Sequence, residues 1–206
     1  KDQHLENFNI RLNSGLEIKK KQKLLKILFY CLNIICTLGK TPRLVTVYSE
    51  SGEFVFDALV LLGDIETRNG NNRKAERYYA QAYGNFSYHP RASEAQIKLG
   101  DTCLAIGKNE NDSEKLLAAE AAFGSVMENE DLDMNVRAEA MYKMGESRFQ
   151  RRDYPGASDY YRQVYNGFPG ALQWAEKSFD RAIGCYDRLG DTDSITKLTV
   201  RKEQWK

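Results

Sequence analysis

An apolar residue followed by glycine recurs along this chain and constrains its fold more than any other feature. The dipeptide occurs at Leu62-Gly63, Leu99-Gly100, Met144-Gly145 and Ile183-Gly184. The glycines are 37, 45 and 39 residues apart, and periods of this size are typical of helical repeat proteins. Glycine inside a helix costs about 1 kcal/mol relative to alanine, so its recurrence at comparable places indicates the close approach of a neighbouring helix.

The residues that follow the glycines predict a second helix in each unit. In the first and third units an alanine lies 12 residues after the glycine and a tyrosine 16 residues after it. These residues are Ala75 with Tyr79 and Ala157 with Tyr161. Positions four apart lie on one face of a helix, so the alanine admits the first helix and the ring fills the space beside it. Turn-forming residues at 69–72 and 152–155 separate the two helices.

This pattern resembles the tetratricopeptide repeat family, whose first helix contains Leu-Gly and whose second contains Ala and an aromatic residue, with Pro near the end. The resemblance covers about residues 56–205, and the unit from Ala138 to Pro169 matches best. In the second unit, Ala119 and Phe123 fit only if residues 109–114 are an insertion that lengthens the hairpin loop. The last unit offers Ile195 and Leu198 instead of the small and aromatic pair, as expected of a capping unit.

The resemblance implies an all-α fold, in which antiparallel helix hairpins form a right-handed superhelix, a tetratricopeptide-like α-solenoid. The expected units are residues 53–92, 93–134, 135–170 and a capping unit at 171–206. Residues 1–52 are expected to form an N-terminal helical region, with Leu24 to Leu38 as the first helix of a degenerate hairpin. Val45, Val47 and Tyr48 fit a strand equally well.

Two unit endings have the form aromatic-x-x-aromatic-Pro or close to it, at Phe86 to Pro90 and Tyr165 to Pro169. They resemble the repeat endings of bacterial envelope lipoproteins of the outer-membrane assembly and Tol-Pal coordinator type. The sequence therefore leaves the compartment open between the cytoplasm and the bacterial periplasm.

Residues suited to catalysis or to metal binding are sparse. The chain has two histidines, His4 and His89, and we expect a hydrogen-bonded structural role for His89 at a unit boundary. Asp131 begins a sequence like a calcium loop, but Val136 replaces the required glycine. The four cysteines lack the spacing of a metal site, so buried free thiols are expected. We expect no enzyme activity, no metal and no cofactor.

Overall charge and hydropathy exclude two further classes of partner. With 30 Lys and Arg residues against 29 Asp and Glu, the formal charge of +1 gives no reason to expect nucleic-acid binding. The apolar stretch from Leu24 to Leu38 contains Lys26 and Asn33 and is shorter than the ~20 residues of a membrane span. It is interpreted as a buried helix, with contact to a membrane or partner as the alternative.

The resemblance also implies a working surface, because the first helices of such repeats line a concave groove that grips a peptide or a partner's helix. Transferred by their offset from the glycine, the candidate groove residues are Asp57, Asp64, Glu94, Ile97, Asp101, Leu104, Glu139, Tyr142, Glu146 and Phe149. Two places are acidic in all three units, which favours a partner with basic and apolar residues. The alternative is a solvated acidic face that binds nothing.

Three functions follow from these observations. The first is a non-catalytic scaffold for protein–protein interaction. The second is an accessory or regulatory domain of a larger enzyme or envelope assembly, which the start at Lys1 instead of Met also suggests. The third is a self-assembling structural module, a homo-oligomer whose incompletely capped ends stack head to tail.

Overall fold

The structure is a computed structural model that describes residues 53–168 and 170–205. The expectations for residues 1–52, including the hairpin with its helix at Leu24 to Leu38 and the alternative strand, lie outside the described residues. The same is true of Pro169, the proline that ends the third repeat. The chain divides into two compact units, residues 1–62 and 63–206.

In the first unit the described residues form the beginning of helix α4 (Glu53–Arg68). Residues 55–60 are buried without interruption, and they include one carboxylate, Asp57. A helix that is apolar all round is covered on more than one side. Asp57, a predicted groove residue, is therefore buried instead of facing a partner.

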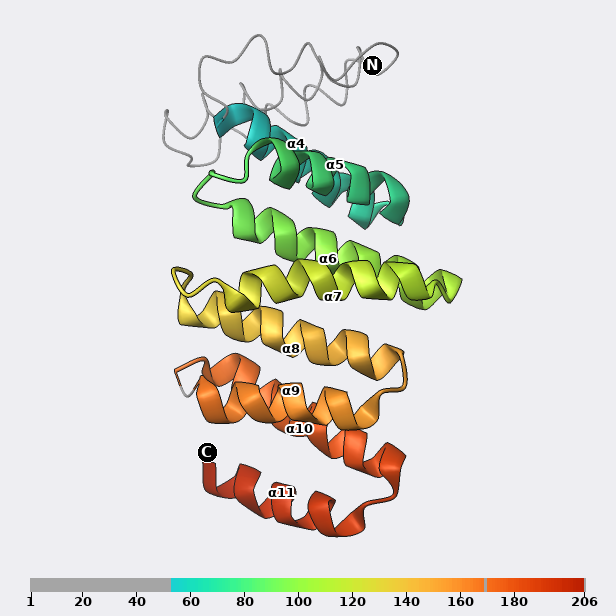
Figure 1. The fold of residues 1–206 in the computed structure, drawn as a ribbon, viewed down its shortest axis with the longest axis vertical. Coiled ribbons are helices and arrows are strands. Elements are labelled where there is room, and N and C mark those ends of the chain that lie inside the picture. Colours follow the sequence, from blue (N-terminus) through green and yellow to red (C-terminus); the bar gives the residue numbers. More distant parts are fainter. Residues whose placement is uncertain (1–52, 169, 206) are drawn as a thin grey trace, which may run out of the picture. The chain divides into compact units, whose positions relative to one another are not determined.

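The second unit contains the end of α4 and seven further helices (Figure 1). These are α5 (Asn72–Asn85), α6 (Ala92–Glu110), α7 (Ser113–Glu128), α8 (Met134–Gln150), α9 (Tyr154–Gly167), α10 (Leu172–Leu189) and α11 (Thr192–Trp205). From α5 onward each helix packs against the next one in the chain, and α8 also contacts both α6 and α10. All regular elements in the described residues are helical. The predicted all-α solenoid is confirmed.

Aspartate side chains start several of these helices. Asp112 accepts hydrogen bonds from the backbone N–H groups of Glu114 and Lys115 at the start of α7. Asp133 and Asp153 cap α8 and α9 in the same way. Each of these caps satisfies a backbone donor that a helix leaves free in its first turn, so the sequence fixes where the helices begin.

The recurring glycines make room for the rings of the second helices. A Cβ atom on Gly63, Gly100 or Gly145 would lie 2.4, 2.4 or 2.6 Å from the nearest ring carbon. The rings concerned are those of Tyr79, Phe123 and Tyr161, all of them buried. The predicted close approach is confirmed for these three units, and the group that approaches is the aromatic side chain.

The fourth glycine was assigned the same role, and that prediction was wrong. A Cβ atom on Gly184 would meet no atom within 4 Å. A small residue, Ala182, is buried two positions earlier in α10, where it is 1% exposed. Helix α11 supplies Leu198 and Trp205 to this core, and the Trp205 ring packs on Phe179, so no ring lies against Gly184.

The predicted long loop in the second hairpin was also wrong. Only residues 111 and 112 separate α6 from α7, and the additional residues lengthen both helices. Asn111 ends α6 in the left-handed conformation, with φ 53°. A Cβ atom on Gly107 would lie 2.6 Å from Leu116, so the lengthened tip carries its own pair of a glycine and a large side chain. The extra residues keep their backbone hydrogen bonds within helices and gain buried contacts.

The two described cysteines, Cys103 and Cys185, are free and buried, as predicted. Burial raises the pKa of each thiol to about 11. Both therefore remain protonated near neutral pH and act as packing residues.

Candidate functional site

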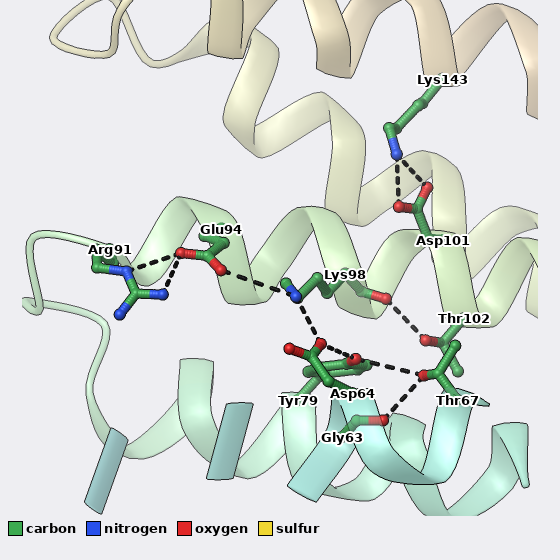
Figure 2. Close-up of polar contacts among 10 residues, drawn as sticks. All are labelled: Gly63, Asp64, Thr67, Tyr79, Arg91, Glu94, Lys98, Asp101, Thr102 and Lys143. Carbon is green, nitrogen blue, oxygen red and sulfur yellow. Dashed lines mark hydrogen bonds and ion pairs between the residues drawn. The ribbon is translucent and has the colours of Figure 1, made fainter. Parts of the chain in front are cut away.

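The acidic residue that follows the first repeat glycine, Asp64, is bonded within the protein. Its Oδ1 accepts a hydrogen bond of 2.7 Å from the Tyr79 hydroxyl of α5 and lies 2.5 Å from Nζ of Lys98 on α6 (Figure 2). Burial and the charge of Asp64 raise the pKa of Tyr79, although the hydroxyl of Thr67 opposes them. Asp64 thus joins the first helix of its repeat to the second helix and to the next repeat.

The third repeat has the same arrangement. Glu146 on α8 accepts a hydrogen bond of 2.7 Å from the Tyr161 hydroxyl of α9 and binds Arg181 of α10 through both of its oxygens. Burial acts to lower the pKa of Arg181, but the hydrogen bond and charge of Glu146 outweigh it, so the pKa is raised. The carboxylate is again shared between a tyrosine and a base.

The second repeat lacks the tyrosine. Asp101 on α6 accepts from Nζ of Lys143 on α8, at 2.6 Å for Oδ1 and 2.5 Å for Oδ2 (Figure 2). The ring beside it belongs to Phe123, which has no hydroxyl to donate. The Asp101 side chain is 43% exposed, against 28% for Asp64 and 21% for Glu146. Burial, and to a lesser degree Glu139, raise the pKa of Asp101, while Lys143 opposes both.

We call these three acid–base pairs the first-helix ladder, because each joins the first helix of one repeat to the first helix of the next. Its members are Asp64 with Lys98, Asp101 with Lys143, and Glu146 with Arg181. The repeat pattern predicted the acids but not the bases. A signal was present, because Lys98 and Lys143 each stand two residues before the repeat glycine, in Lys-x-Gly-acid.

The two outer acids share the lysines of the ladder. Glu94 lies 2.7 Å from Arg91 and 3.8 Å from Lys98. Glu139 lies 3.3 Å from Lys143. Each lysine therefore faces two carboxylates, and the negative charge predicted from the sequence is largely, but not fully, balanced within the protein.

The predicted apolar groove residues take part in packing between helices. Ile97 is buried in a core cluster with Val126 and Ala140. Leu104 is half-buried and packs against the cluster that contains Phe123 and Met144. These side chains hold the stack together, so Ile97 has no surface to offer a partner and Leu104 has little.

The two predicted aromatic residues are half-buried on α8. The ring centroid of Tyr142 lies 5.3 Å from that of Trp174 on α10. The Phe149 ring lies 4.4 Å from the guanidinium carbon of Arg181, a cation–π arrangement. Burial, reinforced by Glu146, raises the pKa of Tyr142 to about 12, so it stays a neutral phenol. These rings keep part of their surface in contact with solvent.

We define the first-helix face as the surface of α6, α8 and α10 that carries Glu94, Asp101, Glu139, Tyr142, Phe149 and Trp174. Its charged members are tied to the ladder, and its apolar members are half-buried rings. Such a surface combines fixed charges with amphipathic rings, the composition of many protein-binding sites.

The described residues offer no group suited to metal binding, since no three His, Cys, Asp or Glu residues among them are placed to hold an ion. The backbone N–H of Arg91 donates to Nδ1 of His89 over 3.1 Å, which confirms the predicted structural role of His89. No helix of the described part is long and apolar enough to span a membrane.

Comparison with known proteins agrees with the repeat geometry. The family model of the tetratricopeptide repeat matches residues 60–126, and a second model of that description matches residues 139–171. The fold is similar to a crystal structure of nearly identical TPR-like repeats from a Podospora anserina candidate kinesin light chain. The TM-score is 0.60 at 13% identity, over 91% of this chain and 88% of that chain. No curated protein matches the chain significantly.

Proposed function

We propose that this chain is a non-catalytic scaffold whose first-helix face binds a peptide or helix of a partner protein. The basis is that the chain carries tetratricopeptide repeats. Repeats of this family generally mediate protein–protein interaction and are typically not catalytic. The observation that carries the proposal is the gathering of half-exposed charged and aromatic side chains on the first-helix face.

We assign the ten predicted groove residues to two roles. Asp64 and Glu146 hold the repeats in register, and Asp57 and Ile97 are buried. Glu94, Asp101, Glu139, Tyr142 and Phe149 keep exposed surface on α6 and α8, with Leu104 at their edge. We propose that this second group contacts the partner.

The chemistry of this group favours a partner segment with basic and apolar side chains. Asp101 and Glu139 share Lys143, whereas Glu94 also pairs with Arg91, so the part of the face around Asp101 keeps an excess of negative charge. The rings of Tyr142 and Phe149 offer apolar surface beside those charges. Complementary charge guides association, and the partly exposed rings supply anchoring contacts.

Photo-crosslinking tests which face binds. A photoreactive phenylalanine derivative replaces Tyr142 on the first-helix face, and in a matched variant it replaces Leu117, which is 50% exposed on α7. Irradiation in extracts of the source cells should attach one defined protein to the first variant and not to the second. Equal labelling at both positions, or labelling at Leu117 alone, would contradict the proposal.

Head-to-tail stacking through the last helix is a weaker candidate. The exposed residues of α11 are mostly polar and include Thr196, Lys197 and Thr199, with Val200 as the large apolar exception. A polar outer face is expected of a helix that meets water at the end of a repeat array. Light scattering should therefore give a mass that does not increase with protein concentration.

A further inference from the structure

We propose that the partner of the first-helix face presents a basic side chain to Asp101 and Glu139, with an apolar side chain next to it on Tyr142 and Trp174. This inference rests on the proposed scaffold function and specifies which chemistry the scaffold recognises. The three ladder carboxylates differ in their partners and in their exposure.

Asp101 lacks the tyrosine donor that the other two ladder carboxylates have. Asp64 and Glu146 each accept a tyrosine hydroxyl and a base from the next repeat. Asp101 accepts only from Lys143, because Phe123 stands where the other repeats have tyrosine. It is also the most exposed of the three.

The charge around Asp101 is unbalanced in the same direction. Asp101 and Glu139 share Lys143, whose side chain is only 16% exposed. Lys98 acts on Asp101 at longer range but is bonded to Asp64. Beside Asp64 and Lys98, Arg91 supplies a second base to Glu94. In the third pair, Arg181 donates two hydrogen bonds to Glu146. An added cation therefore gains more favourable electrostatic energy beside Asp101 and Glu139 than beside either of the other two ladder pairs.

An apolar anchor lies beside this charge. Tyr142 is three residues after Glu139 on α8, so the two side chains lie on the same face of the helix. Its ring contacts those of Trp174 and Tyr161 at 5.3 and 5.5 Å between centroids. Rings held in this way lose little freedom on binding, which suits them to receive an apolar side chain.

The combination selects one class of partner segment. A carboxylate on the partner would meet Asp101 and Glu139 as like charges, which disfavours acidic segments. A guanidinium presents several donors in one plane and can serve two carboxylates together, so arginine fits better than lysine. The expected segment therefore has an arginine with an aromatic or aliphatic residue close to it in sequence.

Selection from a displayed library of short random peptides tests this without knowledge of the natural partner. The full chain is the bait, and the peptides recovered are sequenced and synthesised. We expect them to contain arginine near an apolar residue, and to bind the Asp101→Asn variant about tenfold more weakly, since a charge-assisted hydrogen bond is lost. The Asp64→Asn variant is the matched control and should bind normally.

A second variant adds a hydrogen-bond donor beside the Asp101 carboxylate without removing its charge. Phe123→Tyr should place a hydroxyl on Asp101, as Tyr79 does on Asp64, and should weaken the peptides several-fold while the fold is kept. Circular dichroism checks that each variant is helical. If the peptides lack basic residues, or bind both variants as tightly as the natural chain, the inference is overturned and the scaffold function stands. If no peptide is recovered, both are contradicted.

Discussion

The second and third repeats have the same fold but treat their key carboxylate differently. In the third, Glu146 is held by a tyrosine and by both donors of Arg181. In the second, Asp101 has a single lysine and twice the exposed fraction, 43% against 21%. The third repeat therefore uses its acid to hold neighbouring helices together. The acid of the second repeat stays partly available to a partner.

Part of this difference comes from one atom. Phe123 and Tyr161 occupy equivalent places against Gly100 and Gly145, and only Tyr161 has a hydroxyl. The apolar packing of the repeat is thus independent of the polar contact added to it. A repeat protein can then keep its fold while it changes which of its acids faces a partner.

Removing the acid should separate the two repeats most clearly. Glu146→Ala leaves Arg181 and the Tyr161 hydroxyl without their partner and should cost about 2–3 kcal/mol of unfolding free energy. Asp101→Ala should cost about 1 kcal/mol or less, because Asp101 is partly exposed and Lys143 keeps its contact with Glu139. Urea denaturation of each variant measures the two values. Equal losses would mean that the rungs do not differ in cohesion.

The glycines should show where the two repeats are alike. Gly100→Ala and Gly145→Ala both force a Cβ atom against a buried ring, so each should lose about 1–3 kcal/mol. Gly184→Ala is the matched control, because nothing lies within 4 Å of the added atom, and it should gain about 0.5–1 kcal/mol from helix propensity. Thermal unfolding of the three variants gives the order. A loss at Gly184 would restore the original assignment of the fourth glycine.

Exchange of the ring hydroxyl should change the stability of the two repeats in opposite directions. Tyr161→Phe removes a donor to Glu146 and should cost about 1 kcal/mol, while Phe123→Tyr adds a donor to Asp101 and should gain up to about 1 kcal/mol. Both changes keep the ring that fills the space beside the glycine. Chemical denaturation measures the difference. A destabilised Phe123→Tyr protein would show that the second repeat has no place for the hydroxyl.

The smallest expected effect concerns pH. The folded protein raises the pKa of Asp101, so the folded state holds this proton more tightly than the unfolded chain does. Stability contributed by that proton is present below the unfolded pKa, about 3.9, and is lost as pH rises through the folded pKa. Compared with Asp101→Asn, the natural chain should lose stability across this interval and none above it. A parallel dependence for both proteins would exclude Asp101 as the source.

The helices and their order could be predicted from the sequence because glycine, alanine and aromatic positions report directly on packing. Two expectations drawn from the repeat pattern were wrong. Gly184 shares the dipeptide but not the ring, and its role belongs to Ala182. The residues at 109–114 looked like a loop, although added helical turns accommodate them with Gly107 against Leu116.

The site was harder to predict because its character depends on contacts between repeats. The acids at Asp64, Asp101 and Glu146 were found, but they looked free, since their bases lie 34 to 42 residues further along the chain. The two internal repeats do carry the signal, in Lys98 and Lys143. A base before the glycine and an acid after it become meaningful only when consecutive repeats are placed side by side.

The first-helix ladder gives the array a direction. The second and third repeats each carry both a base and an acid, so each accepts from one neighbour and offers to the other. In the fourth unit Ile183 follows Ala182 where the others have an acid, and the series stops there. An internal repeat could therefore be duplicated in evolution, and the array lengthened, without any loss of matched partners at the new junctions.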